Sequence, residues 1–552
     1  MKNTQFSVPF AAVAVCTLLL TGCAQQYSKA KKKSIASITA TPEQEDMARS
    51  LKPHSKQPLT QLGGYLDLAN ASRLRLDSTP SDTRAQSDYN FAVGRIIEII
   101  ENQNLTPWIE PILCQSGGGK PWRLSFTPLD LHPEITPANF EILPADRYDF
   151  NGKLVGERMT KPGLGAPLVI VGKDQDYTKL DEFVQGEHIY YGLTAAVRFE
   201  GRECEIILRD PLKVETVQLD RHSYPLAADF QAPLALSLAE LDLKKKEMSA
   251  FFNPSKNADT ARLARLQPYD PTKIPVLFIH GLTNSQATWM PMIDSLRGDA
   301  TIRANYQFWI FTYPTGQPYP IPAATLRSEL DKIKGQYPDH KDIVVVGHSM
   351  GGMISRLLIT DSNMTLWNNA FDKPPSENAG LLRLDGKTSQ LMRDLLIFKA
   401  RPDVSRVIYA SASHRGSESA TNFLGRLGAK IVGNPVAGDE INDEVVNASR
   451  NNIKRIPNSI DVLDPDSPFL KAVDTLKPDP RIPYHSIIGD RGKGGNLDRT
   501  KPVSTDGIVP YWSSHLDGAQ SELIIPSEHW TILHPDGIAE VNRILHLHLG
   551  QN

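Results

Sequence analysis

The hydrophobic residues of this 552-residue chain follow different periods in different parts of it. In residues 59–76 and 84–102, apolar side chains recur every three or four positions, which predicts two amphipathic helices. The segment between them, 78–82, reads Ser-Thr-Pro-Ser-Asp and is suited to a turn followed by a helix N-cap. We therefore expect an antiparallel helical hairpin near the start of the folded chain.

From about residue 108 to residue 212 the apolar runs become short, and Pro and Gly residues separate them, which predicts strands. Residues 167–171 are one such run. Residues 193–199 and 203–208 flank a three-residue turn, so they predict a β-hairpin. The pattern leaves two placements open, because the hairpin could begin the sheet of the following domain or belong to a separate amino-terminal domain.

Beyond residue 263, short apolar runs alternate with helical patterns. The runs are continuous rather than alternating, which is typical of parallel strands that are covered on both faces. Strands that alternate with helices along the chain predict an α/β fold with a doubly wound, mostly parallel sheet. The strand-like runs are 274–279, 306–313, 343–346, 404–410, 484–489 and 523–526, and the helical patterns include 323–337 and 535–549.

One of these runs leads into a group of small residues around a serine. Four β-branched residues, 343–346, are followed by Gly347-His348-Ser349-Met350-Gly351-Gly352 and then by apolar residues at helical spacing. Strand, sharp turn and helix in this order form the context of a nucleophile elbow, in which small residues are needed because the turn crowds its own backbone. The alternative is an ordinary Gly-Ser turn, but the flanking elements favour a nucleophile.

On these residues the chain resembles the α/β-hydrolase superfamily, and within it the lipases and esterases that carry G-H-S-M-G-G. The resemblance implies a catalytic triad in the chain order serine, acid, histidine, with the histidine between the last strand and the last helix. His529 matches that loop better than His534, which directly precedes Pro535.

Two aspartates are candidates for the acid. Asp506 lies in Thr-Asp-Gly-Ile-Val-Pro, which resembles the D-G-x-V-P segment of bacterial and phospholipid-acting lipases. Asp490 ends the predicted strand 484–489, where many members of the superfamily carry the acid. We expect Asp506, with Asp490 as the alternative.

The resemblance also implies an oxyanion hole. The run 274–279 leads into His280-Gly281, and by position the two donors are the backbone N–H groups of Leu282 and Met350. Each such donor contributes about 3 kcal/mol to the transition state. Ser349 would form an acyl-enzyme that water resolves. This chemistry requires no metal or organic cofactor.

The start of the chain predicts export. Residues 1–22 have a short positive end and an apolar core, as a signal peptide does. Leu-Thr-Gly-Cys at 20–23 resembles the lipobox of bacterial lipoproteins, which implies that Cys23 carries a lipid anchor. By the same resemblance, Ala24 implies the outer membrane, facing the periplasm. Cys114 and Cys204 would then be in an oxidising compartment, either as a disulfide or as two unpaired buried thiols.

The expected layout is a signal peptide (1–22), a flexible tether (23–58), an amino-terminal region (59–262) and a catalytic domain (263–552). Two insertions, about 361–402 and 418–483, would form a cap over Ser349. The net charge of −3 does not indicate binding to nucleic acid, which would need a basic face. The sequence leaves the oligomeric state open.

We therefore expect a membrane-anchored serine hydrolase that cleaves carboxylic esters. The family resemblance and the expected location imply that these are lipid esters. An acyltransferase or a thioesterase would use the same triad. An alternative that is not an enzyme is an envelope lipoprotein whose hydrolase fold binds a partner.

Overall fold

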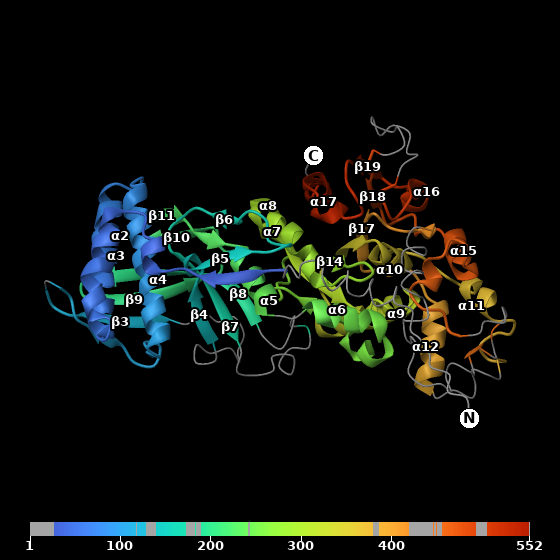
Figure 1. The fold of residues 1–552 in the computed structure, drawn as a ribbon, viewed down its shortest axis with the longest axis horizontal. Helices are drawn as coiled ribbons and strands as arrows, with labels where there is room; N and C mark the ends of the chain where they lie inside the picture. Colours follow the sequence, from blue (N-terminus) through green and yellow to red (C-terminus); the bar gives the residue numbers. More distant parts are fainter. Residues whose placement is uncertain are drawn as a thin grey trace, which may run out of the picture.

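The computed structural model describes residues 27–117, 119–127, 140–172, 183, 189–240, 243–378, 386–418, 445–446, 449, 455–492 and 505–550. Two large sheets lie side by side along the long axis of the molecule (Figure 1). One has six strands from the amino-terminal half, and the other has seven strands from the carboxy-terminal half.

The seven-stranded sheet confirms the predicted α/β fold class. The strand order is β13-β15-β14-β16-β17-β18-β19, and all neighbours are parallel except β13 and β15. The strands are β13 (Arg262–Arg265), β14 (Ile274–Ile279), β15 (Tyr306–Thr312), β16 (Ile343–His348), β17 (Val404–Ala410), β18 (Tyr484–Gly489) and β19 (Ser521–Ile525).

Helices cover both faces of this sheet, which explains the continuous hydrophobic runs. Along β16, Ile343 and Val345 join one hydrophobic core, while Val344 and Val346 join another on the opposite face. The first face is covered by α9 (Pro320–Gln336), α10 (Met350–Leu358), α11 (Thr365–Ala370), α12 (Gly386–Leu396) and α15 (Pro468–Thr475). The second face is covered by α7 (Met290–Gly298), α8 (Ala300–Asn305) and α17 (Pro535–His548).

The amino-terminal sheet has the strand order β2-β3-β9-β8-β7-β4, and the predicted helical hairpin, α3 (Pro58–Ser78) and α4 (Thr83–Asn102), shares its core. The hairpin β8–β9 belongs to this sheet and not to the seven-stranded sheet, which decides between the two placements left open by the sequence. The strands are β2 (Ile112–Cys114), β3 (Trp122–Thr127), β4 (Phe140–Pro144), β7 (Ala166–Gly172), β8 (Ile189–Glu200) and β9 (Glu203–Arg209).

The predicted flexible tether, 23–58, is wrong for its described part, which is folded from residue 29. The short strand β1 (Lys29–Lys32) pairs with β5 (Tyr148–Asn151), and α2 (Pro42–Leu51) packs against α3 and α4. Thr41 accepts a hydrogen bond from the N–H of Gln44 and so caps α2. The sequence pattern did not predict this helix, because most of its residues are polar and few apolar side chains, such as Leu51, are buried.

The predicted signal peptide, 1–22, and the lipid-bearing Cys23 lie outside the described residues. Among the helices that the structure describes, none is long and apolar enough to cross a membrane.

Cys114 and Cys204 are free, buried thiols. They lie on β2 and β9, and β3 runs between those two strands. Two strand spacings separate their Cα atoms by at least roughly 9.5 Å. A disulfide needs Cα atoms less than about 7 Å apart, so the structure favours the second alternative, two unpaired thiols.

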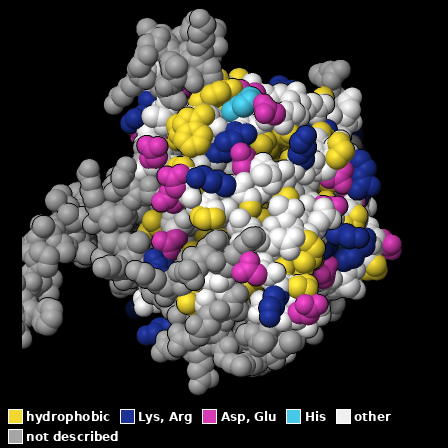
Figure 2. Space-filling view, turned by 90° about the vertical axis from the view of Figure 1, so that its right-hand side faces the viewer, with side chains coloured by type: hydrophobic (Ala, Val, Ile, Leu, Met, Phe, Trp, Pro, Cys, Tyr) yellow, Lys and Arg dark blue, Asp and Glu magenta, His cyan; other side chains and the backbone are white. Residues whose placement is uncertain are grey.

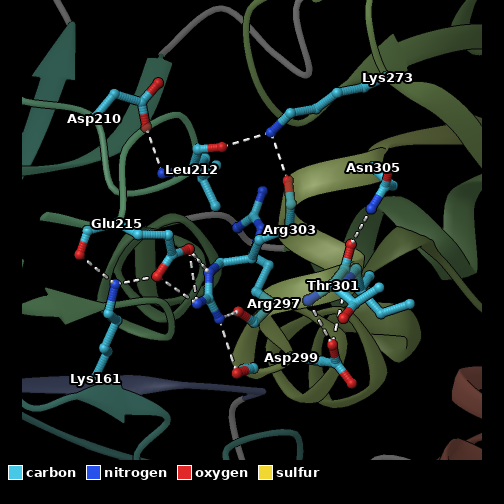
Figure 3. A network of polar contacts seen from close by, with 12 residues as sticks. Lys161, Asp210, Leu212, Glu215, Lys273, Arg297, Asp299, Thr301, Arg303 and Asn305 are labelled. Carbon is cyan, nitrogen blue, oxygen red and sulfur yellow. Dashed lines mark hydrogen bonds and ion pairs between the residues drawn. The ribbon is translucent and has the colours of Figure 1, made fainter. Parts of the chain in front are cut away.

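The two halves are joined by polar contacts as well as by apolar packing. Arg303 of α8, whose side chain is 4% exposed, donates to both carboxylate oxygens of Glu215 over 2.9–3.0 Å (Figure 3). Glu215 also pairs with Lys161 of the amino-terminal half. The ammonium group of Lys273 donates to the carbonyl oxygen of Leu212, across the same boundary. Charged groups of the two halves therefore meet directly at this boundary.

The outer face of the carboxy-terminal half carries mixed charges. Where its side chains are described, Lys and Arg residues alternate with Asp and Glu residues and with scattered hydrophobic groups (Figure 2). This part of the surface therefore shows no broad area of positive charge.

Candidate active site

Ser349 lies in a strained turn between β16 and α10. Its backbone has φ 55° and ψ −122°, a conformation that L-residues rarely adopt, and its N–H donates to the carbonyl oxygen of Ala410 over 2.9 Å. A Cβ atom on Gly347 would lie 2.3 Å from Ser355 Oγ, and one on Gly351 would lie 2.1 Å from the carbonyl oxygen of Ile279. The small residues in the motif are thus required by the turn itself.

The structure brings the three predicted triad residues into one hydrogen-bonded line. His529 Nε2 is 2.9 Å from Ser349 Oγ, and His529 Nδ1 is 2.8 Å from Asp506 Oδ2. Ser349, His529 and Asp506 are 9%, 6% and 2% exposed. They follow β16, β19 and β18, respectively. Because these strands are parallel, their carboxyl ends bring the three residues to the same end of the sheet.

Asp506 is held as a carboxylate. Its Oδ1 accepts the backbone N–H groups of Ile508 and Val509 over 2.8 and 2.7 Å. Burial would raise the pKa of Asp506, but the charge and hydrogen bond of His529 and these two N–H groups outweigh burial and keep its pKa below the ordinary value. The site therefore presents an ionised acid to His529 Nδ1.

The alternative residues have other contacts. Asp490 Oδ1 accepts the N–H of Gly492 over 2.7 Å, within its own loop. His534 Nδ1 accepts the N–H of Asp536 over 3.2 Å and caps α17. Neither residue forms part of the line that ends at Ser349.

The two predicted oxyanion donors lie on either side of the serine. Met350 is the first residue of α10, and Leu282 follows Gly281, where a Cβ atom would lie 2.9 Å from Ser349 Cβ. Within the described part of the chain, neither the Leu282 nor the Met350 N–H has a hydrogen-bond acceptor. An N–H without an internal acceptor is what an oxyanion donor requires.

The described parts of the two insertions meet on the same face of the sheet as α10. Thr360, at the start of the first, bridges to Pro478 near the end of the second, and α11 packs on α15. Between them lies a cavity of about 200 Å³ with an almost wholly apolar lining. The lining includes Ile321, Phe371, Met392, Leu396, Ile456 and Phe469.

His348 has a contact that the sequence pattern did not predict. Its Nε2 lies 2.8 Å from the backbone carbonyl oxygen of His529. The only sequence signal was its place directly before the nucleophile, and that place alone does not identify a partner 181 residues away.

Among the residues that the structure describes, no three or more His, Cys, Asp or Glu side chains form a cluster that could hold a metal ion.

Comparison with known proteins gives one family match. Residues 276–541 match the model of the alpha/beta hydrolase family. No curated protein sequence matches the chain. Similar solved structures include the mature lipase BlEst2 of Bacillus licheniformis, which is 18% identical and covers 50% of this chain and 93% of its own, with a TM-score of 0.30. The metagenomic carboxyl esterase MGS0156 is 13% identical and covers 50% of this chain and 76% of its own, with a TM-score of 0.28. Phospholipase PlaB of Legionella pneumophila is 15% identical and covers 45% of this chain and 45% of its own, with a TM-score of 0.27. Likenesses this weak carry no information about substrate.

Proposed function

We propose, from the premise that residues 276–541 of this chain are an α/β-hydrolase domain, that the protein hydrolyses carboxylic esters with Ser349 as the nucleophile. The observation that carries the proposal is the unbroken hydrogen-bonded line from Asp506 through His529 to Ser349. The position of Ser349 between the carboxyl end of β16 and the start of α10 also supports this role.

In the proposed reaction, His529 Nε2 accepts the hydroxyl proton of Ser349 as Oγ attacks the ester carbonyl carbon. The Leu282 and Met350 N–H groups donate to the oxyanion that develops. Asp506 accepts the Nδ1–H of His529, so it fixes the tautomer and stabilises the imidazolium. The imidazolium protonates the leaving alcohol. Water, deprotonated by His529, then releases the acid from the acyl-enzyme.

An apolar acyl group suits the cavity between the insertions. The Thr283 N–H, next to Leu282, donates to Thr315 Oγ1 over 3.3 Å, and the Gly316 carbonyl oxygen accepts the Ser459 N–H over 3.1 Å. Pro318 and Pro457, which line the cavity, lie two residues from Gly316 and Ser459 in the chain. Apolar side chains dominate sites that bind aliphatic groups. We therefore propose esters of aliphatic, lipid-like acids as the substrate class.

The first experiment is active-site labelling of untethered protein with a fluorophosphonate, beside the Ser349→Ala variant. Labelling of the wild type and its loss in the variant are expected, and ester panels of increasing acyl length then define the substrate. No labelling of folded wild-type protein, with or without detergent, would exclude an activated serine and leave the binding-protein alternative. Product analysis with added alcohol separates hydrolysis from acyl transfer.

We also propose that Cys23 is lipidated and anchors the protein in the bacterial outer membrane, facing the periplasm. The support is the sequence Leu-Thr-Gly-Cys at 20–23 after an apolar segment. The Cys23→Ala variant should leave the membrane fraction and lose incorporation of a labelled fatty acid. Retention of both in the variant would contradict the anchor.

A further inference from the structure

His348 is a fully buried side chain among aromatic groups beside the candidate triad. Its ring stacks on Trp530 with the centroids 5.7 Å apart, and it lies perpendicular to the Trp289 ring with the centroids 6.5 Å apart. The His529 ring is 4.9 Å away. The packing leaves the His348 ring little freedom to turn, so its one hydrogen bond has a defined direction.

That hydrogen bond fixes the tautomer of His348. A carbonyl oxygen can only accept, so His348 Nε2 must carry the proton that it donates to His529 O over 2.8 Å. Its Nδ1 has no hydrogen-bond partner among the described residues and lies 3.2 Å from the position of a Cβ on Gly281. Burial keeps His348 neutral by lowering its pKa to about 3.

We propose that His348 is a positioning residue that fixes the main chain of His529 relative to Ser349. His348 directly precedes Ser349, so its hydrogen bond joins the nucleophile turn to the backbone of the base. The bond leaves both ring nitrogens of His529 for Ser349 and Asp506. The inference rests on the proposed function, because it assigns a role in the same reaction.

The role depends on the Nε2–H donor and not on the size of the ring. His348→Phe keeps a ring in the aromatic packing but removes the donor, whereas His348→Gln can place an amide N–H near the position of Nε2. Because displacement of a reacting group by about 1 Å costs on the order of 100-fold in rate, we expect His348→Phe to lower kcat about 10- to 100-fold with KM little changed. His348→Gln should recover most of this loss.

His340→Phe is the matched control. His340 is also buried, its Nδ1 lies 2.8 Å from a backbone carbonyl oxygen, and it precedes the opposite end of β16. Its replacement should alter stability but leave kcat and the rate of fluorophosphonate labelling unchanged. Circular dichroism establishes that each variant is folded before its rates are compared.

The outcomes separate the two proposals. Wild-type protein that neither labels nor turns over an ester would overturn the proposed function, and the role of His348 with it. An active wild type beside a His348→Phe variant within twofold of its kcat would overturn the positioning role alone. A folded His348→Gln variant as slow as His348→Phe would do the same.

Nitrogen NMR of the wild-type protein gives a test that needs no His348→Phe variant. We expect the His348 ring to show one protonated nitrogen, Nε2, from pH 5 to pH 8, and the His348→Gln spectrum assigns the signal by its loss. A proton on Nδ1, or on both nitrogens at pH 6, would overturn the inference.

Discussion

Each residue of the candidate site has its chemistry set by a small number of neighbours. Asp506 is almost fully buried, yet two backbone N–H groups and His529 satisfy its carboxylate. His529 receives one partner on each ring nitrogen. Asp506 depends on these donors, because a buried carboxylate without hydrogen-bond donors becomes protonated.

Asp506→Asn should therefore reduce kcat by about 10³- to 10⁴-fold, because an amide cannot stabilise the imidazolium and favours the wrong tautomer of His529. Steady-state hydrolysis of an ester on which the wild type is active measures the loss. Asp490→Asn is the matched control and should stay within severalfold of the wild type. Equal losses in the two variants would contradict the assignment of Asp506.

The glycines of the elbow make a second prediction at this scale. Gly351→Ala should destabilise the protein by several kcal/mol, on the order of 3, because the new Cβ would meet backbone oxygens of β14 and the following residue. Gly335→Ala, in α9 with nothing within 4 Å of the new Cβ, should stabilise it by about 0.5–1 kcal/mol. Urea unfolding measures both, and opposite signs are the expected result.

At the scale of elements, strands and helices with a strong period were predictable, and contacts between distant segments were not. The runs that became β14, β16 and β17 were continuous because both faces are covered. Ser349, His529 and Asp506 followed from motifs and from chain order. Neither α2 nor the hydrogen bond from His348 to His529 was predicted. Most residues of α2 are polar, and the hydrogen bond joins residues that are 181 positions apart in the chain.

The cavity between the insertions allows a prediction about elements that act together. Ala370, on α11, lines that cavity, so Ala370→Phe should fill part of it. If the cavity binds acyl groups, kcat/KM should fall at least tenfold for long-chain esters and stay within about twofold for acetate esters, since each excluded methylene forfeits about 0.8 kcal/mol. Thr475→Phe, at an exposed position of α15, is the control. An unchanged chain-length profile would place the acyl group elsewhere.

At the scale of the whole molecule, several buried histidines make stability depend on pH. Burial lowers the pKa of His280, His485 and His548 to about 4 and that of His348 to about 3, and it lowers the pKa of His414 well below its ordinary value. At pH values between about 4 and 6.5 the unfolded chain therefore binds more protons than the folded chain, so acid favours unfolding.

We expect the free energy of unfolding to fall as the pH is lowered from 6.5 towards 4, by up to about 1.4 kcal/mol per pH unit for each such histidine. His515 acts in the opposite direction: burial would lower its pKa, but Glu522 and Asp517 outweigh burial and raise it. Urea titrations at pH 7.5, 6 and 5 measure the sum. Equal stability at pH 6.5 and pH 5 would contradict the lowered pKa values, because it would mean that the folded and unfolded chains bind equal numbers of protons.

Phe183 of the amino-terminal half is fully buried in the core on the α9 face of the hydrolase sheet, and its carbonyl oxygen accepts the Arg265 N–H of the edge strand β13 over 2.7 Å. This contact bears on the order of folding during synthesis. Residue 183 leaves the ribosome about 340 residues before β19 is complete, which at ordinary rates of synthesis is roughly 17–70 s. The amino-terminal half can therefore fold first and offer a finished surface to each hydrolase strand as it appears. Its place before the hydrolase sheet in the chain sets the order in which the enzyme is assembled.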